Sequence, residues 1–163
     1  MNHIVEVKMG GLEIVTGEKG ELKTFVGSCV AICLFDIKAK IAAMAHVMLP
    51  KKENDKNYEG TKGKYADEAF RHMVKNMLKM GADHKRIQAK MAGGAAIFSH
   101  ESEPNVFNIG SRNVAAIKQI LQENGIILVS EDTGANFGRW VKFSLSSGEM
   151  TVTSNLKKIE KII

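Results

Sequence analysis

Two short apolar segments, separated by a few polar and small residues, constrain the fold of this chain more than any other feature. Val30–Phe35 and Ile41–Met48 are rich in residues that favour β-strands. The intervening Asp36–Ala39 has the length of a short hairpin loop. The sequence therefore predicts a β-hairpin in which Phe35 pairs with Lys40.

In this register Cys29 lies directly opposite His46. Directly opposed residues have Cβ atoms about 4.5–5.5 Å apart, close enough for a thiol to hydrogen-bond an imidazole. Gly27 and Ser28 allow a sharp turn before the sulfur, which would direct backbone N–H groups toward an oxyanion. The hydroxyl of Thr24, on what we expect to be an adjacent strand, would orient the imidazole. These residues predict a nucleophilic cysteine whose pKa is lowered by His46.

The same residues have plainer interpretations. A lone cysteine or histidine in an apolar strand is usually an ordinary core residue. Metal binding is a second alternative, but Cys29 and Cys33 would lie about 13 Å apart along one strand. The histidines and cysteines show no chelating spacing elsewhere. We therefore expect no metal and no cofactor, and we expect Cys33 in the core.

The rest of the chain alternates strands with two amphipathic helices. Apolar spacing predicts helices at Tyr65–Met80, ended by Gly81, and at Ser111–Glu123. Further strands are predicted at Arg86–Met91, Ile126–Ser130, Arg139–Leu145 and Glu149–Thr153. Together these elements predict an α/β (α+β) fold in one domain spanning residues 1–163. Its architecture would be a layered sandwich, with a mixed, mainly antiparallel sheet and outer helices.

Composition restricts the location and the partners. Two cysteines and no apolar run near the roughly 20 residues of a membrane span predict a cytoplasmic protein without direct membrane insertion. The net charge of +5 arises in residues 51–90, which hold 11 Lys+Arg against 6 Asp+Glu. This basic region is either an ordinary solvated face or steers an acidic partner. With 6% aromatic residues and no recognition motif, nucleic-acid binding is not expected.

Six short motifs resemble one known family when they are taken together. They are Gly27-Ser28-Cys29-Val30-Ala31-Ile32-Cys33, Ala43-Met44-Ala45-His46-Val47-Met48-Leu49-Pro50, Lys64-Tyr65-Ala66-Asp67, Ala92-Gly93-Gly94-Ala95, Asn108-Ile109-Gly110-Ser111-Arg112-Asn113 and Glu131-Asp132-Thr133-Gly134. Their order and content closely resemble the CheD family, the chemoreceptor glutamine deamidases of bacterial and archaeal chemotaxis.

The resemblance implies a cysteine hydrolase that converts glutamine side chains of methyl-accepting chemotaxis receptors to glutamate. Cys29 would be the nucleophile, His46 the base and Thr24 the third catalytic residue. The resemblance also implies a three-layer sandwich similar to the catalytic fold of cytotoxic necrotizing factors. A further implied partner is a CheC-type phosphatase, which acts on phosphorylated CheY.

Two glycines offer a candidate substrate contact. The segment Ala92–Ala95 follows a predicted strand but lacks the Lys-Ser/Thr sequence of a phosphate loop. We interpret Gly93 and Gly94 as a close backbone approach beside the site, where they and Ser28 would contact the substrate main chain. Residues 132–134 and Arg139 either line the same pocket or serve as turn and loop.

Other functions remain open at this point. A non-catalytic binding partner of the CheC-type phosphatase would keep the fold without the chemistry, although it would have no chemical need for Cys29 and His46. Cysteine-dependent peptidase or transglutaminase chemistry would use the same pair on a different group.

Overall fold

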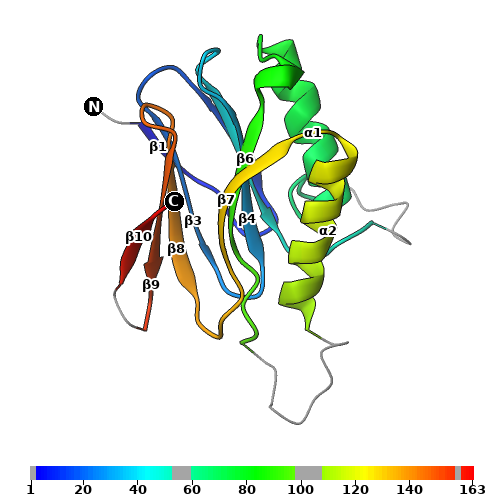
Figure 1. Cartoon of the computed structure of the whole chain (residues 1–163), viewed down its shortest axis with the longest axis vertical. Coiled ribbons are helices and arrows are strands. Elements are labelled where there is room, and N and C mark those ends of the chain that lie inside the picture. Colours follow the sequence, from blue (N-terminus) through cyan, green and yellow to red (C-terminus); the bar gives the residue numbers. More distant parts are fainter. Residues whose placement is uncertain (1–2, 53–59, 98–107, 157–158) are drawn as a thin grey trace.

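The computed structural model describes residues 3–52, 60–97, 108–156 and 159–163. Within these residues the strands form two five-stranded sheets that pack face to face. Two α-helices cover the free face of one sheet, as Figure 1 shows. The three layers are therefore sheet, sheet and helix, which confirms the predicted α/β sandwich with outer helices.

Sheet A is the sheet without helices, and its strands lie in the order β1-β3-β8-β9-β10. They are His3–Glu6 (β1), Gly20–Val26 (β3), Arg139–Ser144 (β8), Glu149–Ser154 (β9) and Glu160–Ile162 (β10). Sheet B lies between sheet A and the helices, in the order β2-β5-β4-β6-β7. Its strands are Leu12–Thr16 (β2), Val30–Asp36 (β4), Ile41–Val47 (β5), Gln88–Gly93 (β6) and Ile127–Thr133 (β7).

The helices are Ala66–Lys79 (α1) and Ile109–Glu123 (α2), with a short 3-10 helix at His84–Arg86 (η1). Among the described strand pairs, β1 with β3 and β6 with β7 are parallel, and the others are antiparallel. This confirms a mixed, mainly antiparallel arrangement. The likeness to cytotoxic necrotizing factors stays a prediction.

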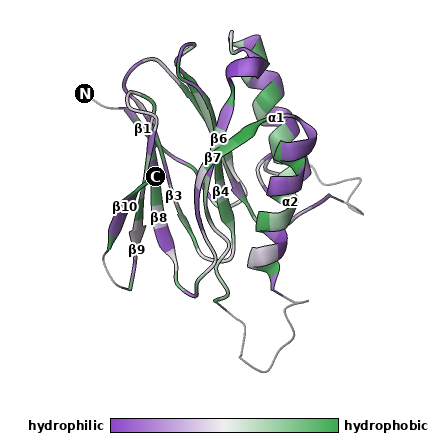
Figure 2. Ribbon diagram, in the orientation of Figure 1, coloured by the Kyte–Doolittle hydropathy of each residue, from purple (hydrophilic) through white to green (hydrophobic). Residues whose placement is uncertain are grey.

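Sheet B is buried on both faces, which explains the apolar character of its central strands. Every residue of β4 and β5 is buried. Ile32 and Leu34 pack toward the helices, whereas Ala31 and Cys33 pack toward sheet A. A strand covered on both sides needs an apolar run rather than an alternating one. Figure 2 shows this contrast, because β4 is mostly hydrophobic while the helices carry both kinds of residue. Cys33 is thus a core residue, as expected.

The predicted hairpin of β4 and β5 is confirmed, but its loop differs from the prediction. Asp36 pairs with Ile41, so the loop comprises residues 37–40. The Asp36 carboxylate accepts a hydrogen bond from the backbone N–H of Ala39 at 3.1 Å. Lys40 has a φ of 57°, in the left-handed region. The Asp36 carboxylate and the left-handed Lys40 together form a loop that begins and ends one residue later than the predicted one.

The register therefore differs by two residues from the prediction. The pairing of Phe35 with Lys40 is wrong, and so is the placement of Cys29 directly opposite His46. Ala31 occupies that opposed position. Because the shift is even, every side chain of β4 stays on the predicted face of the sheet.

Both predicted helices are confirmed with small differences at their ends. α1 begins after Tyr65, and Gly81 has a φ of 109° just beyond its end. α2 begins two residues before the predicted Ser111, because the side chain of Asn108 caps the helix by accepting from the Ser111 N–H at 3.2 Å. No helix in the part of the chain that the structure describes is both long and apolar enough to cross a membrane.

The four further predicted strands correspond to β6, β7, β8 and β9; β8 and β9 begin at the predicted residues, and the other ends are shifted by one to three residues. The edge strands β1, β2 and β10 were not part of the prediction.

Candidate active site

The chain crosses from sheet A to sheet B through the turn Gly27–Cys29, which joins β3 to β4. This crossing lies at the end of the sandwich where α2 begins, the lower end in Figure 1. Cys29 is half-buried and packs against the cluster between the sheets, which includes Ala31 and Cys33. The sulfur therefore belongs to the space between the two sheets, at its end.

His46 lies near the end of β5 and is 3% exposed. It has the same parity along β5 as Met44, which packs toward sheet A, so the imidazole faces sheet A as well. Ala31 is directly opposite His46. Cys29 therefore lies diagonally across from His46 on the same face. Diagonal cross-strand neighbours are about 7–8 Å apart, a distance that larger side chains can bridge.

Thr24 reaches the imidazole from the opposite sheet. Its Oγ1 lies 2.9 Å from His46 Nδ1 and 2.7 Å from the carbonyl oxygen of Val7, to which it donates. The strands that carry Thr24 and His46 do lie against each other, but they belong to different sheets, β3 to sheet A and β5 to sheet B. The contact instead spans the interior of the sandwich, where both side chains point.

This geometry assigns the tautomer of the imidazole. A hydroxyl carries one proton, and Thr24 gives it to the Val7 carbonyl. The Nδ1 of His46 must therefore carry the ring proton and donate it to Thr24 Oγ1. That leaves the lone pair on Nε2, a buried atom for which the described residues offer no hydrogen-bond partner. The ring is thus oriented at one nitrogen and free to accept a proton at the other.

Burial sets the protonation of the pair. Desolvation lowers the pKa of His46 and raises the pKa of the Cys29 thiol. Both shifts favour the neutral forms, so the resting pair is thiol and imidazole. The expectation that His46 lowers the thiol pKa is therefore not met in the resting protein.

The two-glycine segment after β6 holds the cysteine turn by its backbone. Gly94 N–H donates to the Cys29 carbonyl at 2.9 Å, and Ala95 N–H donates to the Gly27 carbonyl at 3.0 Å. Gly93 has a φ of 117°, and a Cβ there would overlap the Cys29 carbonyl oxygen. The predicted close backbone approach is confirmed. Contact of Gly93, Gly94 and Ser28 with a substrate stays a prediction.

Arg139 secures this segment from sheet A. Its side chain is 1% exposed and donates to the carbonyls of Gly93 at 2.9 Å and Gly134 at 2.7 Å. Its Nε lies 3.8 Å from the carboxylate of Asp132. Arg139 thus joins the ends of β6 and β7, and Thr133 and Gly134 line a pocket together with Gly94, so both roles left open for these residues stay predictions.

Sequence reasoning missed Asn113, a fully buried residue of α2. Its Nδ2 donates to the Met48 carbonyl at 3.0 Å and lies 3.5 Å from the Ser28 carbonyl. One amide thus joins the cysteine turn to the segment that follows His46. A signal was present, because Asn113 shares the four-residue spacing of the buried Ile117 and Leu121 on α2.

The backbone N–H groups of Ser28 and Cys29 are available in the turn, because neither donates a hydrogen bond to an acceptor among the described residues. Such amides beside a cysteine are the donors that an oxyanion requires. In the described ranges, His, Cys, Asp and Glu side chains form no group of three that could hold a metal ion.

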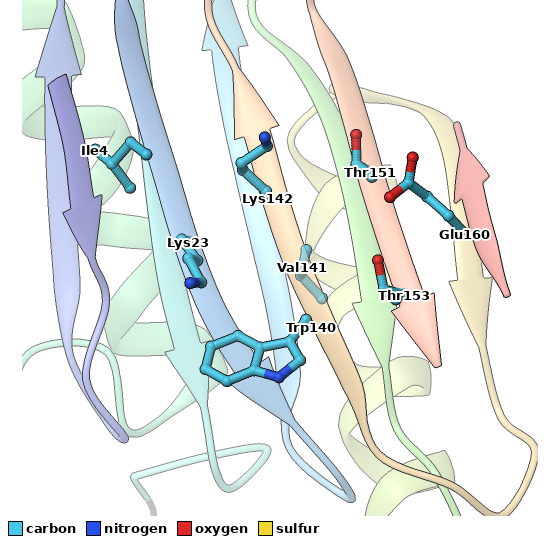
Figure 3. A pocket seen from close by; sticks show the side chains of 8 residues that line it. All are labelled: Ile4, Lys23, Trp140, Val141, Lys142, Thr151, Thr153 and Glu160. Carbon is cyan, nitrogen blue, oxygen red and sulfur yellow. The ribbon is translucent and has the colours of Figure 1, made fainter. Parts of the chain in front are cut away.

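A hollow lies on the outer face of sheet A, away from the cysteine turn (Figure 3). It has a volume of about 370 Å³ and is lined by Ile4, Lys23, Trp140, Val141, Lys142, Thr151, Thr153 and Glu160. The Lys23 ammonium lies 4.5 Å from the centre of the Trp140 ring. No thiol or imidazole lines this hollow, so we do not assign the active site to it.

Comparison with known proteins gives a consistent result. A family model described as CheD chemotactic sensory transduction matches residues 48–154. The chemoreceptor glutamine deamidase CheD of Thermotoga maritima is 46% identical over 129 residues, covering 78% of this chain and 76% of that protein. The probable chemoreceptor glutamine deamidase CheD of Archaeoglobus fulgidus is 45% identical over 150 residues, covering 90% and 92%. Its counterpart in Caldanaerobacter subterraneus subsp. tengcongensis is 43% identical over 139 residues, covering 85% of each chain. The chain belongs to the CheD family.

Proposed function

We propose that this protein deamidates glutamine side chains of chemoreceptors, with Cys29 as nucleophile, His46 as base and Thr24 as the residue that orients the imidazole. Relatives that are 43–46% identical to it over the aligned 129–150 residues are named for this activity. The observation that carries the assignment of residues is the buried Nε2 of His46, for which the described residues offer no hydrogen-bond partner, on the face of sheet B against which Cys29 packs.

The first chemical step forms a thioester. His46 Nε2 takes the proton of the Cys29 thiol while the sulfur attacks the carboxamide carbon of the substrate. The C=O electron pair moves onto oxygen, and the N–H groups of Ser28 and Cys29 hold the resulting oxyanion. The imidazolium then gives its proton to the departing nitrogen, the C–N bond breaks and ammonia leaves.

The second step hydrolyses the thioester. Water gives a proton to His46 Nε2 as its oxygen attacks the acyl carbon. The C–S bond breaks, the sulfur regains a proton from the imidazolium and glutamate is released. The balance is one glutamine and one water consumed for one glutamate and one ammonia.

The neutral resting pair suits this sequence of events. An imidazole that already carried a proton at Nε2 would be unable to accept one from the thiol. Burial therefore keeps the base available, and the bond from Nδ1 to Thr24 stabilises the imidazolium when it forms.

The surrounding backbone supports the proposed reaction geometrically. Asn113 contacts the cysteine turn at the Ser28 carbonyl, and the glycine segment holds it through the carbonyls of Gly27 and Cys29. Ser28, Gly93 and Gly94 lie at this turn and would contact the substrate main chain. A rigid turn keeps the sulfur and the oxyanion donors in a fixed relation, which is what positioning contributes to rate.

The proposal extends to the setting of the reaction. The chain would act in the cytoplasm as one domain on the cytoplasmic part of chemoreceptors. The family resemblance supports a CheC-type phosphatase as a further partner. A purely non-catalytic role is disfavoured, because binding alone requires neither a thiol nor an oriented imidazole with a free nitrogen.

The test is a digest of a receptor cytoplasmic fragment before and after incubation with the protein. We expect defined glutamine-containing peptides to gain the small mass of amide-to-acid conversion, with ammonia released in equal amount. Cleaved peptides would indicate a peptidase, and cross-linked peptides a transglutaminase. Either result, or unchanged masses, would overturn the deamidase assignment.

A further inference from the structure

A groove of about 460 Å³ lies along the exposed side of α2, beside the segment that follows β5. Its lining residues are Leu49, Pro50, Lys51, Ile109, Arg112, Ala115, Ala116 and Gln119. Most of these side chains are apolar or small, and the two cations stand at exposed positions. The groove thus offers apolar contact area bordered by positive charge, with no carboxylate among its lining residues.

The two cations of the groove differ from nearby lysines. Lys52 pairs with Glu68 at 2.9 Å, and Lys118 pairs with Glu131 at 2.9 Å. Lys51 and Arg112 make no ion pair with any of the described residues. No carboxylate of the described residues neutralises either charge, so an acidic ligand would gain both interactions without breaking an ion pair among those residues.

The groove lies beside residues that support the candidate active site, on the chain segment after His46 and on α2. Leu49 lies three residues after His46, directly after Met48. Asn113 follows Arg112 on α2 and donates to the Met48 carbonyl at 3.0 Å. A polypeptide lying in the groove would thus rest on α2 and on the segment that follows β5, which Asn113 of α2 joins to the cysteine turn.

We propose that this groove binds a segment of the substrate polypeptide that carries acidic side chains beside apolar ones and that flanks the target glutamine. This inference rests on the proposed deamidation of a protein substrate. Leu49, Pro50 and Ile109 bury the apolar side chains. Lys51 and Arg112 orient the segment by its carboxylates and raise its rate of encounter. The groove thereby selects which glutamines reach Cys29.

The test compares two double variants with the same change of charge. Lys51→Glu/Arg112→Glu reverses the groove, and Lys23→Glu/Lys142→Glu reverses two lysines at the hollow of Figure 3, on the outer face of sheet A. Binding of a receptor cytoplasmic fragment is measured by titration at about 50 mM and about 500 mM salt, since salt screens exposed charges. Steady-state deamidation gives kcat and KM, and thermal melting confirms the fold of each variant.

We expect the groove variant to raise Kd and KM by about tenfold or more at low salt, with kcat within about twofold of wild type. The difference should shrink at high salt, and the control variant should bind like wild type. Equal weakening in both variants would mean that only net charge matters, and an unchanged Kd in the groove variant would mean that the groove is not used. Either result overturns the inference. If the groove variant binds more weakly but the wild-type protein releases no ammonia, the binding role of the groove is supported and the deamidase assignment is contradicted. The two proposals can therefore fail separately.

Discussion

Thr24 Oγ1 lies 2.9 Å from His46 Nδ1, and this buried contact joins the two sheets of the sandwich at the candidate site. Because Thr24 already donates to Val7, the ring proton must sit on Nδ1 and the basic lone pair on Nε2. The cross-sheet hydrogen bond thus determines which nitrogen faces the chemistry.

Removal of the Thr24 hydroxyl should slow the reaction without weakening substrate binding. In Thr24→Val the shape is kept but Nδ1 loses its acceptor. We expect kcat to fall by about tenfold or more, because a hydrogen bond to a charged group, here the imidazolium formed in the reaction, is worth about 1.5–3 kcal/mol and about 1.4 kcal/mol is tenfold in rate. KM should change little, and Thr24→Ser should retain most activity. Equal kcat for the valine and serine variants would contradict the orienting role.

The pH dependence of kcat/KM should reflect the neutral resting pair. Only neutral His46 can accept the thiol proton, and burial lowers its pKa, so activity is present above that pKa and lost as the pH falls through it. The acid limb should therefore lie below about pH 6.5, the ordinary value for histidine. Burial raises the pKa of Cys29, which places the alkaline limb above about pH 8.5.

The rate of alkylation of Cys29 tests independently whether the resting thiol is protonated. Iodoacetamide should react slowly with Cys29 at pH 6, because little thiolate is present. Rapid alkylation at that pH would indicate a resting thiolate–imidazolium pair and would contradict the protonation described above.

Asn113 should affect the reaction by holding the cysteine turn in place, not by contacting the substrate. Asn113→Asp keeps the shape but removes the donor and turns an oxygen toward the Met48 carbonyl. We expect a lower kcat at unchanged KM, measured well below the melting temperature. Asn108→Asp on the same helix is the matched control, because an aspartate there still accepts from the Ser111 N–H. A loss of melting temperature with kcat unchanged would reduce Asn113 to a packing residue.

Alanine substitutions at Gly93 and Gly81 should distinguish the cost of backbone strain from the cost of a steric overlap, because the two glycines have similar φ angles. Gly93 has a φ of 117° and Gly81 a φ of 109°. A Cβ at Gly93 would overlap the Cys29 carbonyl, whereas a Cβ at Gly81 would meet nothing within 4 Å. Gly81→Ala should cost only the left-handed strain, about 1–2 kcal/mol in the free energy of unfolding. Gly93→Ala should cost more and should also abolish activity, because the cysteine turn must move. Urea unfolding and ammonia release measure both effects, and equal costs would refute the close approach.

Local patterns in the sequence predicted much of this fold. The hairpin of β4 and β5 and both helices follow from short-range spacing, so their existence and type were correct. The hairpin register depended on which loop residue adopts a left-handed conformation, and the apolar run from Val30 to Phe35 gave no alternation that would reveal a shift of two. The even shift kept Cys29 and His46 on one face, which is why the pairing survived a wrong register.

Contacts between distant segments were beyond such reasoning. Thr24 was expected on a strand adjacent to His46, and the sequence did not indicate that the two residues meet across the sandwich, from different sheets. Asn113 acts on Met48, 65 residues earlier in the chain, and no local pattern pairs them. The substrate contacts expected for Ser28, Gly93 and Gly94 stay predictions, because that question concerns a bound polypeptide.

The most direct test of the account is ammonia release from a receptor cytoplasmic fragment by the Cys29→Ala variant. The variant should melt like wild type, since Cys29 is only half-buried and bonds to its neighbours through its backbone. The account predicts that ammonia release falls to background and that the glutamine-containing peptides keep their mass. Ammonia released at the wild-type rate by a folded Cys29→Ala protein would contradict the assignment of Cys29 as the nucleophile.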